Sequence, residues 1–229
     1  MNYNFNRSPI QIDTGLNGYM SSVFSKMFMA LCLTGGVSYV CSTNARVLQV
    51  LSGGVSTLLM LVTLGIVFYL SSCIHKISVE RASAFFWIYA TLIGLSFSPL
   101  FAVFTGESLA TTFFTTSIFF GSMSLYGYVT KRDLTGLGSF MTVGLFSVVI
   151  ATIINIFLRN SFLQMGLSAI TIVVFCGLTA YDIQRIRDLY VRADNSETAS
   201  KCAILGALSL YLDFINIFLA LLRFVGNRK

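Results

Sequence analysis

The sequence predicts an all-α membrane protein of seven transmembrane helices, and three observations lead to this prediction. Hydrophobic residues make up 55% of the 229 residues and charged residues only 10%, whereas about a quarter of the residues are charged in a typical soluble domain. The mean hydropathy is +0.80. The Lys and Arg residues lie at the ends of long apolar runs, so the net charge of +6 does not indicate nucleic-acid binding.

Seven apolar runs are long enough to be bilayer spans, because a helix needs about 20 apolar residues to cross the hydrocarbon core. The connections between these runs are short and leave no room for a separate soluble domain. We therefore expect a cytoplasmic N-terminal tail at 1–22, with no cleavable signal peptide, and a single seven-helix domain at 23–229. The expected spans are 23–43, 48–74, 82–104, 109–129, 137–158, 162–183 and 203–225.

The distribution of basic residues predicts the orientation in the membrane. If the N-terminus is cytoplasmic, ten Lys and Arg residues fall on the inner side and five on the outer side. Since basic residues favour the cytoplasmic side, the N-terminus is expected inside and the C-terminus outside. A re-entrant last segment would instead return the basic C-terminal residues to the inside.

Two of the nine acidic residues stand apart from the others. Asp182 and Asp213 lie in the apolar stretches VFCGLTAYDIQRI and LSLYLDFINIF, near the inner ends of the last two spans. An ionised acid in the hydrocarbon region costs about 2.5–3.5 kcal/mol or more, so such residues usually face a protein interior and mark a functional site. The two spans run in opposite directions with their acids at similar depth, so we expect the carboxyl groups to meet.

A pair of adjacent carboxyl groups has two chemical uses. Both groups cannot ionise cheaply, so they tend to share one proton and titrate in two separate steps. When fully deprotonated, they are hard oxygen ligands suited to Ca²⁺. The structural alternatives are that Asp182 is a solvated residue at the end of the span 162–183, and that Asp213 makes only a structural hydrogen bond between helices.

Other polar residues are candidates for supporting roles. Lys76 is a candidate latch that pairs with ionised Asp182, or alternatively an anchor whose side chain reaches the lipid headgroups. His75, the single histidine, is a candidate pH sensor, although a lone histidine in a loop is usually just exposed. Asn216 and Asn155 are expected to make hydrogen bonds between helices rather than to bind a ligand. The run TTFFTTSIFF in the fourth span is expected to pack, with the alternative that it lines a water-filled path.

The sequence contains no motif that indicates an enzyme or a bound cofactor. It has no HExxH, GxSxG or phosphate-binding glycine loop, and its five cysteines are scattered singly. An intramembrane aspartyl protease also needs two acids in helices, but its GxGD context is missing before Asp213, where Leu210, Tyr211 and Leu212 stand. We therefore expect neither catalysis, nor a cofactor, nor a nucleic-acid partner.

Three stretches carry a resemblance to a known family. They are SLYGYVTKRDLTGLGSF at 124–140, GLTAYDIQRI at 177–186 and LGALSLYLDFINIFLALLRFVGNR at 205–228. They resemble the Bax-inhibitor family, the transmembrane Bax-inhibitor-motif proteins, in a bacterial form. The similarity runs from about residue 17 along nearly the whole chain. It implies a bundle in which six helices surround a hydrophobic last helix.

The resemblance also implies a function. Members of this family are described as pH-sensitive Ca²⁺ leak channels with a proton-sharing aspartate pair near the cytosolic mouth, and these aspartates fall on Asp182 and Asp213. The family's basic latch falls on Lys76, where some relatives have arginine, which is the better bidentate partner. Some relatives carry an acid in the second helix, but this chain has none between Asp13 and Glu80. A slow leak is therefore expected rather than a fast channel.

The expected function is a slow passage of Ca²⁺ through a bacterial inner membrane, gated by protonation of the aspartate pair. Ca²⁺ is the transported species, held transiently by Asp182 and Asp213, and protons and membrane lipid are the other expected partners. Two alternatives belong to other classes. One is an interaction protein that restrains a membrane protease or another membrane protein, in which the aspartates are structural. The other is a proton-coupled cation exchanger.

Overall fold

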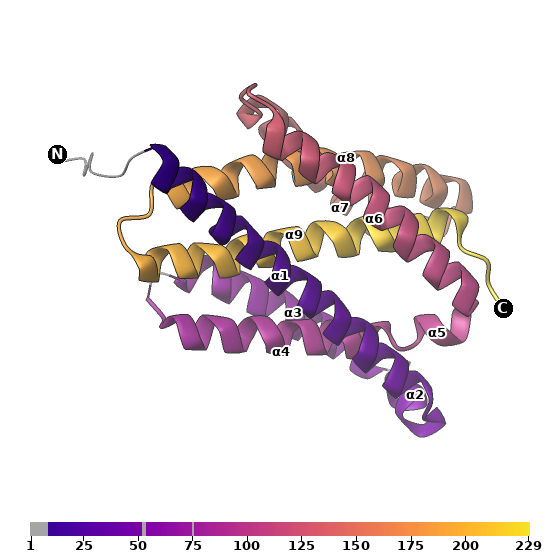
Figure 1. Ribbon diagram of the computed structural model, residues 1–229. Helices are drawn as coiled ribbons and strands as arrows, with labels where there is room; N and C mark the ends of the chain where they lie inside the picture. Colours follow the sequence, from indigo (N-terminus) through magenta and orange to yellow (C-terminus); the bar gives the residue numbers. More distant parts are fainter. Residues whose placement is uncertain (1–8, 52–53, 75) are drawn as a thin grey trace.

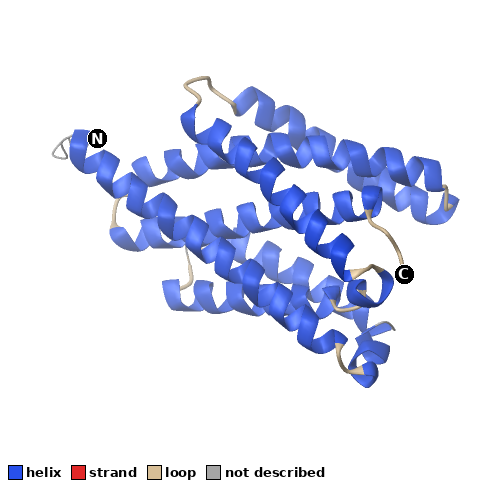
Figure 2. Ribbon diagram, turned by 45° about the vertical axis from the view of Figure 1, so that its right-hand side comes forward, coloured by secondary structure: helices blue, strands red, loops and turns tan. Residues whose placement is uncertain are grey.

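The computed structural model describes residues 9–51, 54–74 and 76–229. Over these residues the chain forms helices and loops and no strand (Figure 1 and Figure 2), apart from an isolated bridge between Phe104 and Arg228. The all-α prediction is therefore confirmed. The helices are α1 (Pro9–Ser42), α2 (Ala45–Leu51), α3 (Gly54–Cys73), α4 (Val79–Phe97), α5 (Leu100–Val103), α6 (Gly106–Val129), α7 (Thr135–Leu158), α8 (Ser161–Val191) and α9 (Ser196–Val225).

Five stretches of the described chain are long and apolar enough to cross a membrane, by length and composition. They are Gly15–Ser42, Val79–Val103, Thr135–Leu158, Ser161–Val191 and Ser196–Val225. The other two expected spans, 48–74 and 109–129, are not among these five: in α3 the stretch found is Leu61–Cys73, and Thr and Ser side chains interrupt the apolar sequence of α6. The membrane class is supported, and the count of seven spans stays a prediction.

Several helices extend beyond the spans expected from the sequence. Helix α1 begins at Pro9, within the segment 1–22 expected to be a tail, and Leu16 and Met20 are buried in the bundle. Helix α8 continues to Val191 and α9 begins at Ser196, so most of the polar segment 185–201 is helical. The helices are longer than the expected spans because a helix can continue past the apolar region wherever polar side chains support it. Glu197 and Lys201 give such support, with an ion pair of 2.8 Å across one turn of α9.

Polar residues in the loops determine where the helices begin. Ser78, Thr105, Asn160 and Asn195 accept backbone N–H hydrogen bonds at the starts of α4, α6, α8 and α9, at 3.4, 3.1, 2.9 and 2.7 Å. These side chains satisfy donors that the first turn of a helix leaves without a partner. Pro99 lacks an N–H group and interrupts the expected span 82–104, which the structure divides into α4 and α5.

Helix α9 lies deepest in the bundle (Figure 1). It makes extensive contacts with α1, α4, α6 and α8, whereas α3 packs mainly on α4, and α7 packs mainly on α8. In its most apolar stretch 67% of α9 is buried, against 0% for α7. A central last helix is in keeping with these contacts, but α3 and α7 form an outer layer, so a direct surround by six helices is not confirmed.

Tyr211 joins three helices in the middle of the core. Its hydroxyl forms a hydrogen bond of 2.7 Å with Thr34 Oγ1, and Thr34 donates to the carbonyl oxygen of Ala90 at 2.9 Å. The Tyr211 ring makes edge-on contacts with Phe86 and Tyr89, at centroid distances of 6.4 and 5.8 Å. A hydrogen-bonded hydroxyl and aromatic contacts thereby hold α1, α4 and α9 together in the buried core.

The loops gather at the two ends of the bundle (Figure 1). One end holds the start of α1 and the connections α3–α4, α6–α7 and α8–α9, and is called here the N end. The opposite end holds the connections α1–α2, α5–α6 and α7–α8 and the end of α9, and is called the C end.

Candidate functional site

Asp182 and Asp213 lie at the interface of α8 and α9, the most extensive helix contact in the bundle. Both are buried, with exposed fractions of 8% and 4%. Asp182 lies well inside α8, because this helix continues to Val191. The alternative that Asp182 is solvated at the end of a helix is therefore wrong.

The two helices pair each acid with a hydroxyl group on the opposite helix. Ser209 of α9 donates a hydrogen bond from Oγ to Oδ2 of Asp182. Asp213, one turn after Ser209, lies beside the hydroxyl of Thr179, which is one turn before Asp182. Residues three and four positions apart share a helix face. Because α8 and α9 are antiparallel, the hydroxyl on each helix lies beside the acid on the other. The two carboxyl groups are close enough to interact electrostatically.

One carboxyl oxygen of this pair has no partner. Oδ2 of Asp213 is buried and forms no hydrogen bond with any residue that the structure describes. The neighbouring Thr179 hydroxyl donates instead to the carbonyl oxygen of Phe175, at 2.7 Å. A buried polar atom without a partner is costly and uncommon. This oxygen is therefore suited to take up a proton or to contact a cation.

Two kinds of side-chain oxygen could contact a cation at this position. Within the described ranges, no group of three or more His, Cys, Asp or Glu side chains gathers in a way that could hold a metal ion. The available ligands are the two carboxyl groups and the hydroxyls of Ser209 and Thr179. These four side chains hold six oxygen atoms, at the lower end of the about six to eight that Ca²⁺ usually takes.

The structure does not bring the candidate latch to the aspartate pair. Lys76 is exposed in the α3–α4 connection and forms no ion pair with a described residue. The positive charge that acts on Asp182 belongs to Arg185, one turn further along α8. The latch stays a prediction. His75 lies outside the described residues.

The two candidate asparagines make local hydrogen bonds. Asn216 donates from Nδ2 to the carbonyl oxygen of Leu212, at 2.8 Å within α9. Asn155 accepts the N–H of Asn160 at 3.1 Å in the α7–α8 connection, at the C end of the bundle. Neither bond crosses between packed helix faces, so a supporting role at the aspartate pair stays a prediction for Asn216. Asn155 lies near the end of α7, at the C end of the bundle and away from that pair.

A polar network closes the N end beside Asp182. The side chain of Gln184 accepts the N–H of Leu134 and donates to the carbonyl oxygen of Arg132, both at 2.8 Å. Arg187 donates to the carbonyl oxygen of Tyr128 at 2.5 Å and lies 5.0 Å from the centre of the Tyr128 ring. These contacts fix the α6–α7 connection against α8.

Sequence reasoning missed the hydroxyls that face the two acids and the clamp formed by Gln184. The spacing of the hydroxyls was available as a signal, because Thr179 precedes Asp182 by one turn and Ser209 precedes Asp213 by one turn. Gln184 gave no such signal, since its partners are backbone groups in a distant loop.

The fold and this site define a class: an all-helical membrane protein with a buried pair of acids between its last two helices. A family model described as "Inhibitor of apoptosis-promoting Bax1" matches residues 16–229. The chain therefore belongs to the Bax inhibitor family, as its three characteristic stretches indicate.

Several bacterial proteins are similar to this chain over nearly its full length. The chain is 44% identical to the uncharacterized protein RP147 of Rickettsia prowazekii over 218 residues, which cover 95% of this chain and 92% of that protein. It is 41% identical over 226 residues to the inner membrane protein YbhL of Escherichia coli, with 97% of each chain covered. A membrane protein of Streptococcus pyogenes serotype M1 is 33% identical over 221 residues, 95% of this chain and 96% of that protein.

Proposed function

We propose that this protein is a slow, pH-sensitive Ca²⁺ leak of the bacterial inner membrane, with seven transmembrane helices and a cytoplasmic N-terminus. The observation that supports it most directly is the buried Oδ2 of Asp213, which has no hydrogen-bond partner among the described residues and lies in a pair of interacting carboxyl groups. The inner-membrane location is suggested by the name of the similar protein YbhL. In this proposal Ca²⁺ is cargo, and neither a catalytic residue nor a resident cofactor takes part.

Protons and Ca²⁺ would compete for the same oxygen atoms. If Asp182 and Asp213 share one proton, a hydrogen bond between them would join α8 to α9. When both groups are ionised, they repel each other and attract a divalent cation. A change of pH therefore changes both the contact between the two helices and the affinity of the site for Ca²⁺, which is the behaviour of a two-state gate.

The remainder of the path would depend on hydroxyl groups. Ser108, Thr112, Thr116 and Ser124 are buried at four- or eight-residue intervals along α6, which packs on α8 and α9. The Thr116 hydroxyl donates to the carbonyl oxygen of Thr112, at 2.7 Å, and keeps its lone pairs available to a cation. The stripe is interrupted by the buried ring of Phe120. A path of uncharged hydroxyl groups that is interrupted by an aromatic ring is in keeping with a slow leak.

The test is Ca²⁺ flux into dye-loaded liposomes that contain the purified protein, measured between pH 6 and 8. We compare the wild type with Asp213→Asn, which keeps the shape of the side chain and removes its titration. The wild-type flux is expected to change with pH, and the flux of Asp213→Asn is expected to lose this pH dependence.

Asp133→Asn is the matched control, because Asp133 is an exposed acid in the α6–α7 connection. Its Oδ1 accepts the N–H of Thr135 at 2.8 Å, and hydrogen bonds with Thr135 lower the pKa of Asp133 from its usual 3.8. A lowered pKa in the folded state gives a stability contribution that is present above the unfolded value and disappears as the pH falls through the folded value. This contribution does not change between pH 6 and 8, so the control keeps the wild-type pH response.

Three outcomes would count against the proposal. Flux no greater than that of empty liposomes at any pH would remove the leak and favour the partner-binding alternative. Proton movement in fixed ratio to Ca²⁺ would identify an exchanger. An unchanged pH response in Asp213→Asn would show that the aspartate pair does not cause the pH dependence of the flux.

A further inference from the structure

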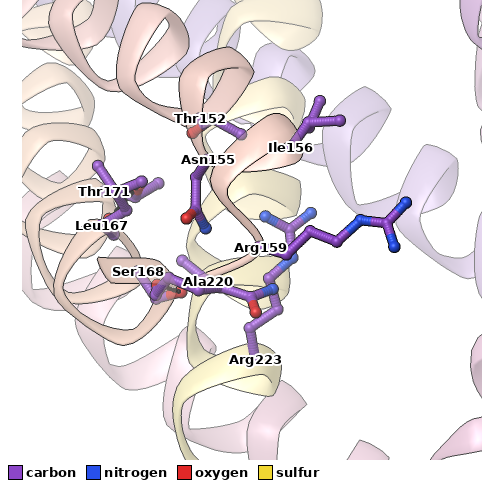
Figure 3. A pocket seen from close by; sticks show the side chains of 10 residues that line it. Thr152, Asn155, Ile156, Arg159, Leu167, Ser168, Thr171, Ala220 and Arg223 are labelled. Carbon is purple, nitrogen blue, oxygen red and sulfur yellow. Dashed lines mark hydrogen bonds between the residues drawn. The ribbon is translucent and has the colours of Figure 1, made fainter. Parts of the chain in front are cut away.

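A second polar site lies at the C end of the bundle, away from the aspartate pair (Figure 3). It is a pocket with a volume of about 310 Å³, between the end of α7, the start of α8 and the end of α9. Arg159, Arg223, Asn155 and Gln164 line it, together with three hydroxyl side chains. None of its lining residues is acidic.

The positive charge of this pocket is not balanced by the protein. Neither Arg159 nor Arg223 forms an ion pair with any residue in the described part of the chain. Figure 3 shows the Arg159 guanidinium extending outward from the rim, the Arg223 guanidinium behind the base of the Arg159 side chain in this view, and the amide of Asn155 on the other side of the pocket. Two unpaired guanidinium groups beside amide and hydroxyl donors favour an anion.

The backbone at Arg159 gives a second, independent observation. Arg159 ends α7 in the left-handed conformation, with φ 50° and ψ 35°, and no other described non-glycine residue has a positive φ. Glycine or asparagine is usual at such a helix end, because a side chain strains this conformation. The turn is held by the Arg159 N–H, which donates to the carbonyl oxygen of Asn155 at 2.8 Å. A long cationic side chain thus stands at the rim of the pocket in a backbone conformation that usually carries glycine or asparagine.

The pocket also lies where a lipid headgroup would be found. It is at the ends of three apolar helices, and its lining includes Ile156, which is 65% exposed. Beside it, Phe157 and Phe162 are each 82% exposed. These exposed apolar side chains lie on the same ends of α7 and α8 as the charged pocket. A molecule with a phosphate group and acyl chains matches both features.

We propose that Arg223 and Arg159 bind a phosphate group in this pocket, supplied by an anionic lipid headgroup or by free phosphate. Arg223 forms the base of the site, and Arg159 closes over the anion from the rim. Asn155 and Gln164 donate from their amides. This site does not depend on the Ca²⁺ leak, because its residues lie at the opposite end of α8 and α9.

The experiment measures binding of phosphatidylglycerol to the purified full chain in neutral detergent, by native mass spectrometry and by the rise in Tm. Phosphatidylcholine and inorganic phosphate are tested in parallel. Arg223→Gln and Arg159→Gln are each expected to weaken phosphatidylglycerol binding about tenfold, the loss of one charged hydrogen-bonding group. Arg46→Gln changes a basic residue at the same end but outside the pocket, and is expected to bind as the wild type does.

The parallel arms separate the two sources of phosphate. A rise in Tm with phosphatidylglycerol alone, lost in both pocket variants, would identify a lipid site. A rise with inorganic phosphate as well, lost in the same variants, would identify a site for free phosphate. Equal binding by the wild type and both pocket variants, or equal binding of phosphatidylcholine and phosphatidylglycerol, would overturn the proposal. If Arg223→Gln does not fold, Arg159→Gln decides the matter, and Arg223→Lys is expected to retain part of the affinity.

Discussion

The two ends of the α8–α9 pair differ in charge and in solvation. Toward the N end, Asp182 and Asp213 are buried, and each lies beside a hydroxyl of the facing helix. At the C end, Arg159 and Arg223 line an open pocket and form no ion pair with described residues. Long basic side chains can reach water and headgroups at the end of a span, whereas a short acid within it must find its partners in the protein.

Helix packing differs between the same two regions. A Cβ atom on Gly127 of α6 would lie 2.9 Å from the Cα of Ala180, two residues before Asp182 in α8. A Cβ atom on Gly166, near the pocket at the other end of α8, would meet nothing within 4 Å. Helix α8 is therefore in close backbone contact with α6 beside the acid pair, whereas near the pocket Gly166 faces open space.

The largest expected change in stability comes from adding a methyl group where α6 and α8 are in close contact. Gly127→Ala places a methyl group against the backbone of α8, which cannot rotate away as a side chain can. We expect it to lower the free energy of unfolding by about 3 kcal/mol, the upper part of the usual range for overpacking. Thermal and SDS denaturation of the purified protein measure this loss.

Gly166→Ala is the matched control on α8. It is expected to leave stability unchanged or to raise it by about 0.5–1 kcal/mol, because alanine favours a helix over glycine. Equal losses of stability in the two variants would show that the packing of the two ends does not differ as described.

A smaller effect is expected from the hydroxyl that faces Asp182. Ser209→Ala removes the hydrogen bond to a buried carboxyl group without adding volume. We expect a loss of about 1.5 kcal/mol in stability, and a shift of about one pH unit in the midpoint of Ca²⁺ flux, since one unit corresponds to about 1.4 kcal/mol.

Ser200→Ala tests whether this effect is specific to the acid pair. Ser200 lies on the same helix, but it is exposed and donates only to the carbonyl oxygen of Ser196, at 2.9 Å. Its flux midpoint is expected to match that of the wild type. If the flux midpoint of Ser209→Ala also equals that of the wild type, Asp182 is excluded from the gate.

The smallest expected effect has the opposite sign and concerns the C end. Arg159→Gly removes the strain of a side chain at φ 50° and is expected to raise stability by about 1 kcal/mol. It also removes a guanidinium group from the pocket, so binding of phosphatidylglycerol should weaken. A stability gain with unchanged lipid binding would leave the strained conformation without a binding role.

The part of the site that could be predicted from the sequence is the part that depends on composition and spacing. Asp182 and Asp213 stand out because each is an acid in an apolar run, and their burial at one interface follows from antiparallel helices. The helix ends were harder to predict, because polar segments such as 185–201 continue the helices beyond the apolar runs. The latch by Lys76 stays a prediction, because which loop residues meet Asp182 depends on the arrangement of the helices, which local sequence does not encode.

By itself, the sequence determined the membrane class, the family and the two acids, since hydropathy and unusual charges are properties of each segment. The tertiary structure alone decided which hydroxyl faces which acid, which carboxyl oxygen remains without a partner, and that Arg159 and Arg223 share a pocket. The physical reason is that these features arise between helices. Ser209 and Asp182 are 27 residues apart in the chain, and their hydrogen bond depends on the register in which α8 and α9 pack.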